Sequence, residues 1–239
     1  MAKRSKKYRE ALERIDAERL YPPKAGFELL KDVDAANYDA TVECSFRLGI
    51  DPRKADQMVR GAVGLPNGIG KNVRVAVVAS GDKVTEAKEA GADHAGGDEI
   101  VEQLSDGSLI EQIDSVIATP DMMGKLGRLG KTLGPRGLMP NPKSGTVTMD
   151  VGKAVSEIKA GRVEYRADRN GNVHAVLGKS SFSTEQLTEN FLALLDEIQR
   201  QRPAATKGRY IRNVSVSTSA SPSIRLDPAR AKATDGQPA

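Results

Sequence analysis

The chain has 239 residues, with 36 Lys and Arg against 32 Asp and Glu, so it can hold one large or two small domains and carries a net charge of +4. This mildly basic balance favours nucleic acid only weakly. Cys44 is the only cysteine, which excludes an internal disulfide and fits a reducing compartment such as the cytosol. No apolar run approaches the roughly 18 residues of a membrane helix, and His94 and His174 lack neighbours at metal-ligand spacing, so we expect no membrane anchor, metal or cofactor.

The first third of the chain predicts an α+β pattern. It opens with a basic arm, MAKRSKKYR, which lacks the apolar segment of a signal peptide. Apolar spacing and turn residues then predict, in order, two helices over residues 8–20 and 24–33, a strand with one buried face over residues 42–48, a short helix from Asp51 to Val59 and a turn-rich hinge over residues 61–71.

The middle of the chain follows a different pattern. VRVAVVAS from Val73 and SVIATP from Ser115 are continuous apolar runs, typical of strands covered on both faces. Helical segments follow at residues 83–90 and 151–160. Short apolar strands that alternate with helices predict a small parallel α/β domain.

The last third returns to the first pattern. Asn170 and Gly171 lie at the centre of a predicted β-hairpin. Ser183 and Gln186 form a predicted capping box for an amphipathic helix, and a strand with alternating valines begins at Tyr210. The composition of residues 229–239 is typical of a disordered tail.

This change of pattern indicates an insertion. Residues 1–67 and 159–228 would form one split α+β domain, an antiparallel sheet with helices, and residues 68–158 an inserted α/β domain. The charges agree, because the segments 1–67, 68–158 and 159–239 hold 13, 10 and 13 basic residues against 11, 13 and 8 acidic ones. Both ends of the chain are therefore basic, and the middle is not.

The segment from Gly124 to Gly145 predicts a loop that approaches a negative charge. It holds six glycines, three prolines and five Lys or Arg, with no acidic residue. A nucleotide-binding phosphate loop would need a glycine five places before Gly130, but that position is Lys125. With no Cys–His pair, no nucleophile elbow and no metal cluster, we expect no enzyme.

RNA binding fits the composition better than catalysis. The chain has no Trp, four Phe and five Tyr, so a stacking platform for several bases is hard to build and folded RNA is the better ligand. The last strand offers short polar groups that can reach an RNA backbone. These are Arg212, Asn213, Ser215, Ser217, Ser219, Ser221, Ser223 and Arg225. A plain solvated edge strand is the alternative interpretation.

Several motifs, in order, make the chain closely resemble the bacterial large-subunit ribosomal protein L-one family, the protein of the mobile stalk. The resemblance extends from KKYRE to about Pro228. Its motifs are LGIDPRKADQMVRGAVGLPNG, EAGADHAGG, ATPDMMG, GRLGKTLGPRGLMPNPKSGTV and EIKAGRVEYR. It implies an α/β two-domain fold: the split α+β domain with an inserted Rossmann-like three-layer α/β domain.

The resemblance also implies a function. The protein would be a cytoplasmic component of the large ribosomal subunit that binds the stalk region of the large-subunit rRNA. It would assist movement and release of exit-site tRNA and repress translation of its own operon mRNA. Outside the ribosome we expect a monomer.

The family's principal rRNA contacts, carried onto this chain, fall on two segments. One holds Asn37, Tyr38 and Thr41, and the other holds Asn213, Ser219, Ala220, Ser221 and Ser223. Relatives commonly read Lys-Phe for Asn37 and Tyr38, and Thr-Met-Gly-Pro-Ser for Ser219 to Ser223. We expect Arg212 and Arg225 to assist these segments. Secondary RNA or interdomain contacts are expected from Lys125, Arg128, Lys131, Arg136 and Lys143.

Two other hypotheses remain open at this stage. One is a phosphate-binding enzyme that uses Lys125, Arg128, Lys131 and Arg136. The other is a basic scaffold without sequence preference, which would bind all duplexes equally and with a steep salt dependence.

Overall fold

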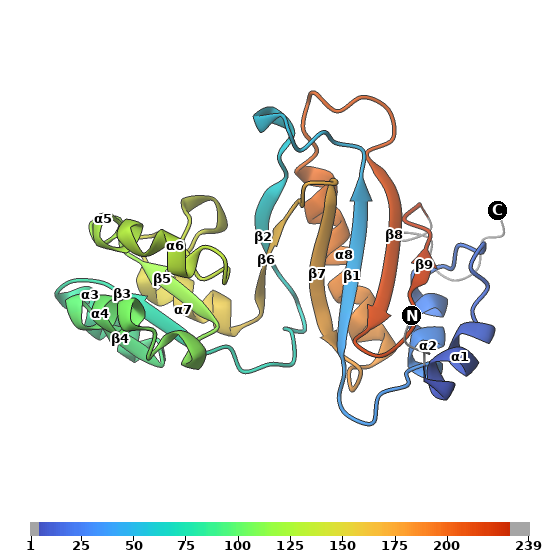
Figure 1. Cartoon of the computed structure of the whole chain (residues 1–239), viewed down its shortest axis with the longest axis horizontal. Helices are drawn as coiled ribbons and strands as arrows, with labels where there is room; N and C mark the ends of the chain where they lie inside the picture. The colour runs from blue at the N-terminus through green and yellow to red at the C-terminus, as the bar shows by residue number, and fades with distance from the viewer. Residues whose placement is uncertain (1–4, 230–239) are drawn as a thin grey trace. The chain divides into compact units, whose positions relative to one another are not determined.

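The computed structural model describes residues 5–229 (Figure 1). The chain divides into two compact units. One contains the residues up to Gly70 together with those from Val163 onward, and the other contains Lys71–Arg162. The first four residues of the predicted basic arm and the predicted tail beyond Ala229 lie outside the described residues.

A four-stranded antiparallel sheet forms the centre of the first unit. Its order is β7 (Asn172–Lys179), β1 (Thr41–Leu48), β8 (Ile211–Thr218) and β9 (Ile224–Leu226). Alternate side chains of β1 are buried, as the sequence predicts. Because β8 pairs with both β1 and β9, the alternative interpretation of this segment as an edge strand is wrong.

Helices cover one face of this sheet (Figure 1). Phe27 of α2 (Pro23–Asp32), Phe46 of β1 and Phe191 of α8 (Thr184–Arg200) are fully buried together. The Phe191 ring centroid lies 6.0 Å from that of Phe27 and 6.1 Å from that of Phe46. The predicted capping box begins α8 and is confirmed. The shorter helix α1 (Lys6–Glu13) precedes α2.

A second, two-stranded sheet in this part of the chain pairs β2 (Arg60–Gly64) with β6 (Arg162–Arg166). Tyr165 of β6 is buried, and its hydroxyl donates to Glu197 Oε1 of α8 at 3.2 Å. Burial, and then the Glu197 carboxylate, raise the pKa of Tyr165, so the ring stays a neutral donor. This hydrogen bond ties β6 to α8.

The second unit has three layers. Its parallel sheet has the order β4 (His94–Gly96), β3 (Val75–Val78) and β5 (Ser115–Ala118). One face packs on α3 (Asp82–Glu89) and α7 (Val151–Lys159). The other packs on α4 (Asp98–Asp106), α5 (Met123–Leu126) and α6 (Gly130–Leu133). The predicted fold class, an antiparallel α+β part with a three-layer parallel α/β part, is confirmed.

Two predicted helices are shorter than expected. The first ends at Glu13 rather than at residue 20, because the Asp16 carboxylate accepts a backbone N–H two residues on and competes with helical bonding. The segment from Asp51 to Val59 contains only the 3₁₀ turn η1 (Ala55–Gln57). There the Gln57 side chain accepts the backbone N–H of Asp51 at 2.8 Å.

The predicted hairpin and hinge also differ from the structure. β6 and β7 lie in different sheets and meet in the bridge Ala167–Val173, because the Asp168 carboxylate accepts the N–H groups of Asn170 and Asn172 and widens the turn. In the predicted hinge, Gly61 to Gly64 belong to β2. The turn-rich part therefore begins after that strand.

The prediction of a loop over Gly124 to Gly145 is wrong for its first half. α5, the 3₁₀ turn η3 (Gly127–Leu129) and α6 follow one another, because Leu126 and Leu133 are buried at helical spacing. The second half contains the 3₁₀ turn η4 (Pro142–Ser144). Gly137 and Gly145 adopt φ of +73°, as expected of glycine in a turn.

Asp114 ties the start of the second unit to β5 and predicts an acid-dependent contribution to stability. Its carboxylate accepts from Lys71 Nζ at 2.7 Å and Arg74 Nε at 3.2 Å. Burial raises the pKa of Asp114, but the hydrogen bonds from Lys71 and Arg74 outweigh it and lower the pKa to about 2 from 3.8. Stability from these bonds is therefore present above pH 3.8 and is lost as the pH falls through about 2.

We expect Asp114→Asn to destabilise the second unit at pH 7 and much less near pH 2. Amide hydrogen exchange of β3 and β5 measures this at pH 7. Urea unfolding followed by far-UV circular dichroism extends the comparison to low pH. A loss of stability of the same size at both pH values would contradict the assignment.

Among residues 5–229, no helix is both long and apolar enough to cross a membrane.

Candidate nucleic-acid interface

Two of the predicted RNA-binding segments meet at one end of the four-stranded sheet. Thr41 begins β1, and Ser219 follows the end of β8. The Ser219 N–H donates to the Thr41 carbonyl at 3.2 Å, and Val42 pairs with Thr218. We call this end the Thr41–Ser219 surface. Its predicted members are Asn37, Tyr38, Thr41, Ser219, Ala220, Ser221 and Ser223.

The side chains before β1 are turned to solvent. Tyr38 is 63% exposed, more than the exposed methionines Met149 (58%) and Met58 (44%). Asn37 is exposed as well, and its Oδ1 accepts from Lys7 Nζ of α1 at 2.8 Å. An exposed ring beside an ammonium group offers one stacking position next to one phosphate contact.

The backbone of this segment is fixed by a clamp at the end of β7. The Asp39 carboxylate accepts from the Ser180 hydroxyl at 3.2 Å and from the N–H and hydroxyl of Ser181 at 2.9 and 3.0 Å. The Ser181 N–H is the main reason that the pKa of Asp39 is lowered. Lys179 Nζ donates to Thr41 Oγ1 at 2.9 Å and places a cation at the start of β1.

A second network joins the two predicted segments through side chains. Thr218 Oγ1 donates to Asp34 Oδ1 at 2.9 Å and accepts the Ser221 N–H at 3.1 Å. The same Asp34 oxygen accepts the Ala36 N–H at 3.2 Å. One carboxylate therefore orients both the segment before Tyr38 and the turn after β8.

In the turn after β8, this chain has Ser221 at a position where relatives commonly have glycine. Ser221 does not adopt positive φ, so its Cβ causes no backbone strain. Ser221 Oγ accepts the Thr218 N–H at 2.9 Å and stays inside the turn. Ser219 and Ser223 are exposed and Ala220 is half-buried, so Ser219 and Ser223 offer the free hydroxyls.

The face of the sheet opposite α8 adds polar groups that the sequence interpretation did not include. Glu43 and Arg47 of β1 and His174 of β7 are exposed there, and Ser45 lies between them. The Ser45 hydroxyl lies 2.9 Å from His174 Nδ1. The sequence could have predicted this polar face, because each of these residues alternates with a buried neighbour along its strand.

Three predicted residues lie away from the Thr41–Ser219 surface. Arg212 and Asn213 are at the opposite end of β8, where Asn213 pairs with Arg47. Seven residues of strand, roughly 23 Å, separate Arg212 from Ser219. Arg225 of β9 pairs with Ser215, and its Nε donates to Asn213 Oδ1 at 3.4 Å. The structure therefore divides the predicted list into two groups.

The five cations predicted as secondary contacts lie in the second unit and are exposed. Lys125 forms an ion pair with Asp98 of α4. Lys125 and Arg128 line a groove of about 530 Å³ with Asp98 and Glu102 on its other side. The segment from Gly124 to Gly145 has no acidic residue of its own, and Asp98 of α4 balances part of its positive charge. Lys131, Arg136 and Lys143 are not in this groove.

The carboxyl end of the parallel sheet lacks the features of a nucleotide site. Asp121 accepts from the Ser80 hydroxyl at 3.3 Å, and Asp82 and Asp98 stand in the first turns of α3 and α4. Carboxylates at these positions repel a phosphate. Within the described residues no cluster of His, Cys, Asp or Glu is arranged to hold a metal.

Comparisons with known proteins agree with this architecture. Residues 30–222 match the ribosomal protein L1p/L10e family. The chain is 58% identical to the large ribosomal subunit protein uL1 of Bifidobacterium animalis subsp. lactis, over 96% of this chain and 99% of the relative. It is 56% identical to the uL1 protein of Thermobifida fusca, over 95% of each chain.

A similar protein from Cutibacterium acnes, also named large ribosomal subunit protein uL1, is 54% identical over 98% of this chain and 100% of the relative. The family consists of ribosomal structural proteins and not enzymes, which confirms the prediction that the chain is not an enzyme. The matched length and these identities show that the chain belongs to the ribosomal protein L1p/L10e family.

Proposed function

We propose that the chain is a structural component of the large ribosomal subunit that binds the stalk region of the large-subunit rRNA through the Thr41–Ser219 surface. The observation that supports this most directly is the pairing of two segments from opposite ends of the chain by the Asp34–Thr218 hydrogen bond at 2.9 Å. Around it stand an exposed ring, free hydroxyls and the Lys7 and Lys179 ammonium groups. This set suits phosphate, 2′-hydroxyl and single-base contacts.

Electrophoretic titration with a stalk rRNA fragment tests this proposal at about 0.15 M salt. We expect binding to the fragment to be at least about 10³-fold tighter than to an unrelated duplex, a ratio typical of specific nucleic-acid complexes. Equal affinity for both RNAs would instead support the basic scaffold without sequence preference.

We also propose that the rRNA site resides in the split domain of residues 1–67 and 159–228, with residues 68–158 as an insertion. All members of the Thr41–Ser219 surface belong to the first unit. A protein that joins these two segments by a short linker is expected to keep rRNA affinity within about tenfold of the full chain, or about 1.4 kcal/mol. Loss of nearly all binding by a folded joined protein would move the site into the inserted domain.

Two further roles belong to the same proposal. The protein assists the movement and release of exit-site tRNA, and it represses its own operon mRNA, which would present a fold similar to the stalk rRNA. The second role predicts competition, since one surface cannot hold two RNAs at once. An operon mRNA fragment that binds without displacing the rRNA fragment would contradict it.

A further inference from the structure

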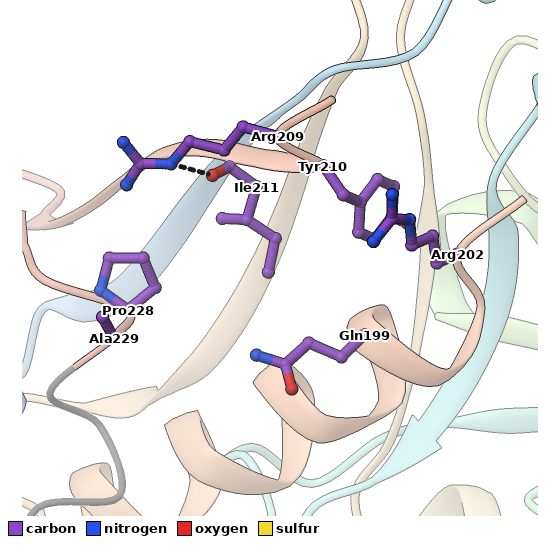
Figure 2. A pocket seen from close by; sticks show the side chains of 7 residues that line it. All are labelled: Gln199, Arg202, Arg209, Tyr210, Ile211, Pro228 and Ala229. Atoms are coloured by element: carbon purple, nitrogen blue, oxygen red, sulfur yellow. Dashed lines mark hydrogen bonds between the residues drawn. The ribbon is translucent and has the colours of Figure 1, made fainter. Parts of the chain in front are cut away.

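A separate pocket lies between the end of α8 and the start of β8 (Figure 2). Its volume is about 380 Å³, within the range of small-ligand sites. Its apolar wall is formed by Ile211, Pro228 and Ala229, and its polar groups come from Gln199, Arg202 and Arg209. The pocket combines one apolar surface with a few donors placed around it.

Two of the donors at the pocket, Arg202 and Arg209, are cationic and partly preoriented. Arg209 Nε donates to the Ile211 carbonyl at 3.0 Å, which fixes the guanidinium and leaves its terminal nitrogens for a ligand. Arg202 lies over the Tyr210 ring, with its Cζ 6.0 Å from the ring centroid. Burial raises the pKa of Tyr210 to about 12, so this wall stays neutral.

The surroundings of the pocket have an excess of positive charge. Residues 200–212 hold five Lys or Arg and no Asp or Glu. Of these, Arg200 is paired with Glu197. Among the residues that the structure describes, no carboxylate lines the pocket itself. An anionic ligand therefore fits the pocket better than a cation or a neutral molecule.

The pocket is distinct from the Thr41–Ser219 surface. It lies at the start of β8, whereas Ser219 follows the end of that strand, roughly 26 Å away along eight residues. A ligand here need not displace RNA from the other end of the sheet.

We propose that this pocket receives one unpaired nucleotide of an RNA strand. The base lies against Ile211 and Pro228, the Gln199 amide bonds the base edge, and Arg209 holds the adjacent phosphate. Unpaired RNA bases are recognised in this way, by an apolar contact together with hydrogen bonds to their edges. A phosphate alone would leave the apolar wall uncovered, and a continuous duplex would keep its bases out of the pocket.

Fluorescence titration of the full chain with a labelled single-stranded octanucleotide tests the proposal, with and without a saturating stalk rRNA fragment. We expect saturable binding in both cases, and tighter binding than to a duplex of the same sequence. Arg209→Gln and Gln199→Leu should each weaken octanucleotide binding roughly 5- to 10-fold or more, as loss of a directed polar contact does. Their affinity for the rRNA fragment should stay unchanged.

Lys88→Gln serves as the matched control for charge, because Lys88 is exposed in the other unit and its loss changes the net charge equally. An equal effect of Lys88→Gln and Arg209→Gln would show general electrostatic attraction and overturn the proposal. So would equal affinity for single strand and duplex, or full competition by inorganic phosphate at equal concentration. The rRNA titration is read separately, so a failure of the proposed function and a failure of this site are distinguishable.

Discussion

Replacing Tyr38 with alanine is expected to weaken binding of the stalk rRNA fragment roughly 5- to 150-fold, because the stacking of one base on an aromatic ring contributes about 1–3 kcal/mol. Tyr38 is 63% exposed, so its ring makes little contribution to the folded core. The neighbouring backbone is fixed by Asp39 and Ser181, so the ring is presented from a rigid segment. Tyr38→Ala should therefore change affinity and not stability.

Two further variants distinguish the contribution of the Tyr38 ring to RNA affinity from other effects of a substitution. Tyr38→Phe keeps the ring and should bind within about twofold of the parent if stacking is the main contribution. Met149→Ala removes a side chain of similar exposure, 58%, from the other unit and should have no effect. If Tyr38→Ala binds the fragment as tightly as the parent, the ring is outside the interface, and the proposed surface must be reduced to its hydroxyls and lysines.

The elements with strong periodicity were predictable from the sequence. α8 has both a capping box and a continuous apolar face, and β1 alternates over its whole length. β9 and β4 have three residues each, too few for a period, and they form because a neighbouring strand offers unpaired groups. The pairing of β2 with β6 joins segments about 100 residues apart and depends on the fold of the rest of the chain.

The members of the candidate site stay a prediction that rests on the resemblance, and the connections between them could not be predicted from the sequence. The extended geometry of β8 places Arg212 and Ser219 at opposite ends of the strand. The sequence interpretation had instead grouped them as one polar edge. The Asp34–Thr218 contact spans 184 residues, so no local pattern could reveal it. The same holds for the contact of Lys179 with Thr41, which requires the register of β7 on β1.

The largest expected effect on stability comes from Asn190 of α8, a fully buried polar side chain. Its Oδ1 accepts the Asn67 N–H at 3.0 Å, and its Nδ2 donates to the carbonyls of Gly68 and Leu177 at 2.9 and 2.7 Å. Asn190→Ala would leave these backbone groups without their partner. We expect a loss of about 3–5 kcal/mol in the free energy of unfolding of the first unit.

Tyrosine signals measure this loss selectively. The chain has no Trp, and its five tyrosines all belong to the first unit: Tyr8, Tyr21, Tyr38, Tyr165 and Tyr210. Urea unfolding followed by near-UV circular dichroism or tyrosine fluorescence therefore reports on that unit alone. Asn67→Ala is the control, because its exposed side-chain bonds to Gln186 and Glu189 should contribute less than about 1 kcal/mol.

A similar small loss in both variants would mean that water replaces the Asn190 contacts and that α8 does not hold the segment before Lys71. A large loss in Asn190→Ala alone would mean that this segment is anchored as far as Gly68. The backbone freedom of the predicted hinge would then be confined to the residues after Gly68.

Among these residues, Gly70 adopts φ of +68°. A Cβ added to Gly70 would lie 2.8 Å from side-chain atoms of Lys179 and Phe182. Because Gly70 has both the conformation and the close approach that exclude other residues, we expect Gly70→Ala by itself to destabilise the first unit.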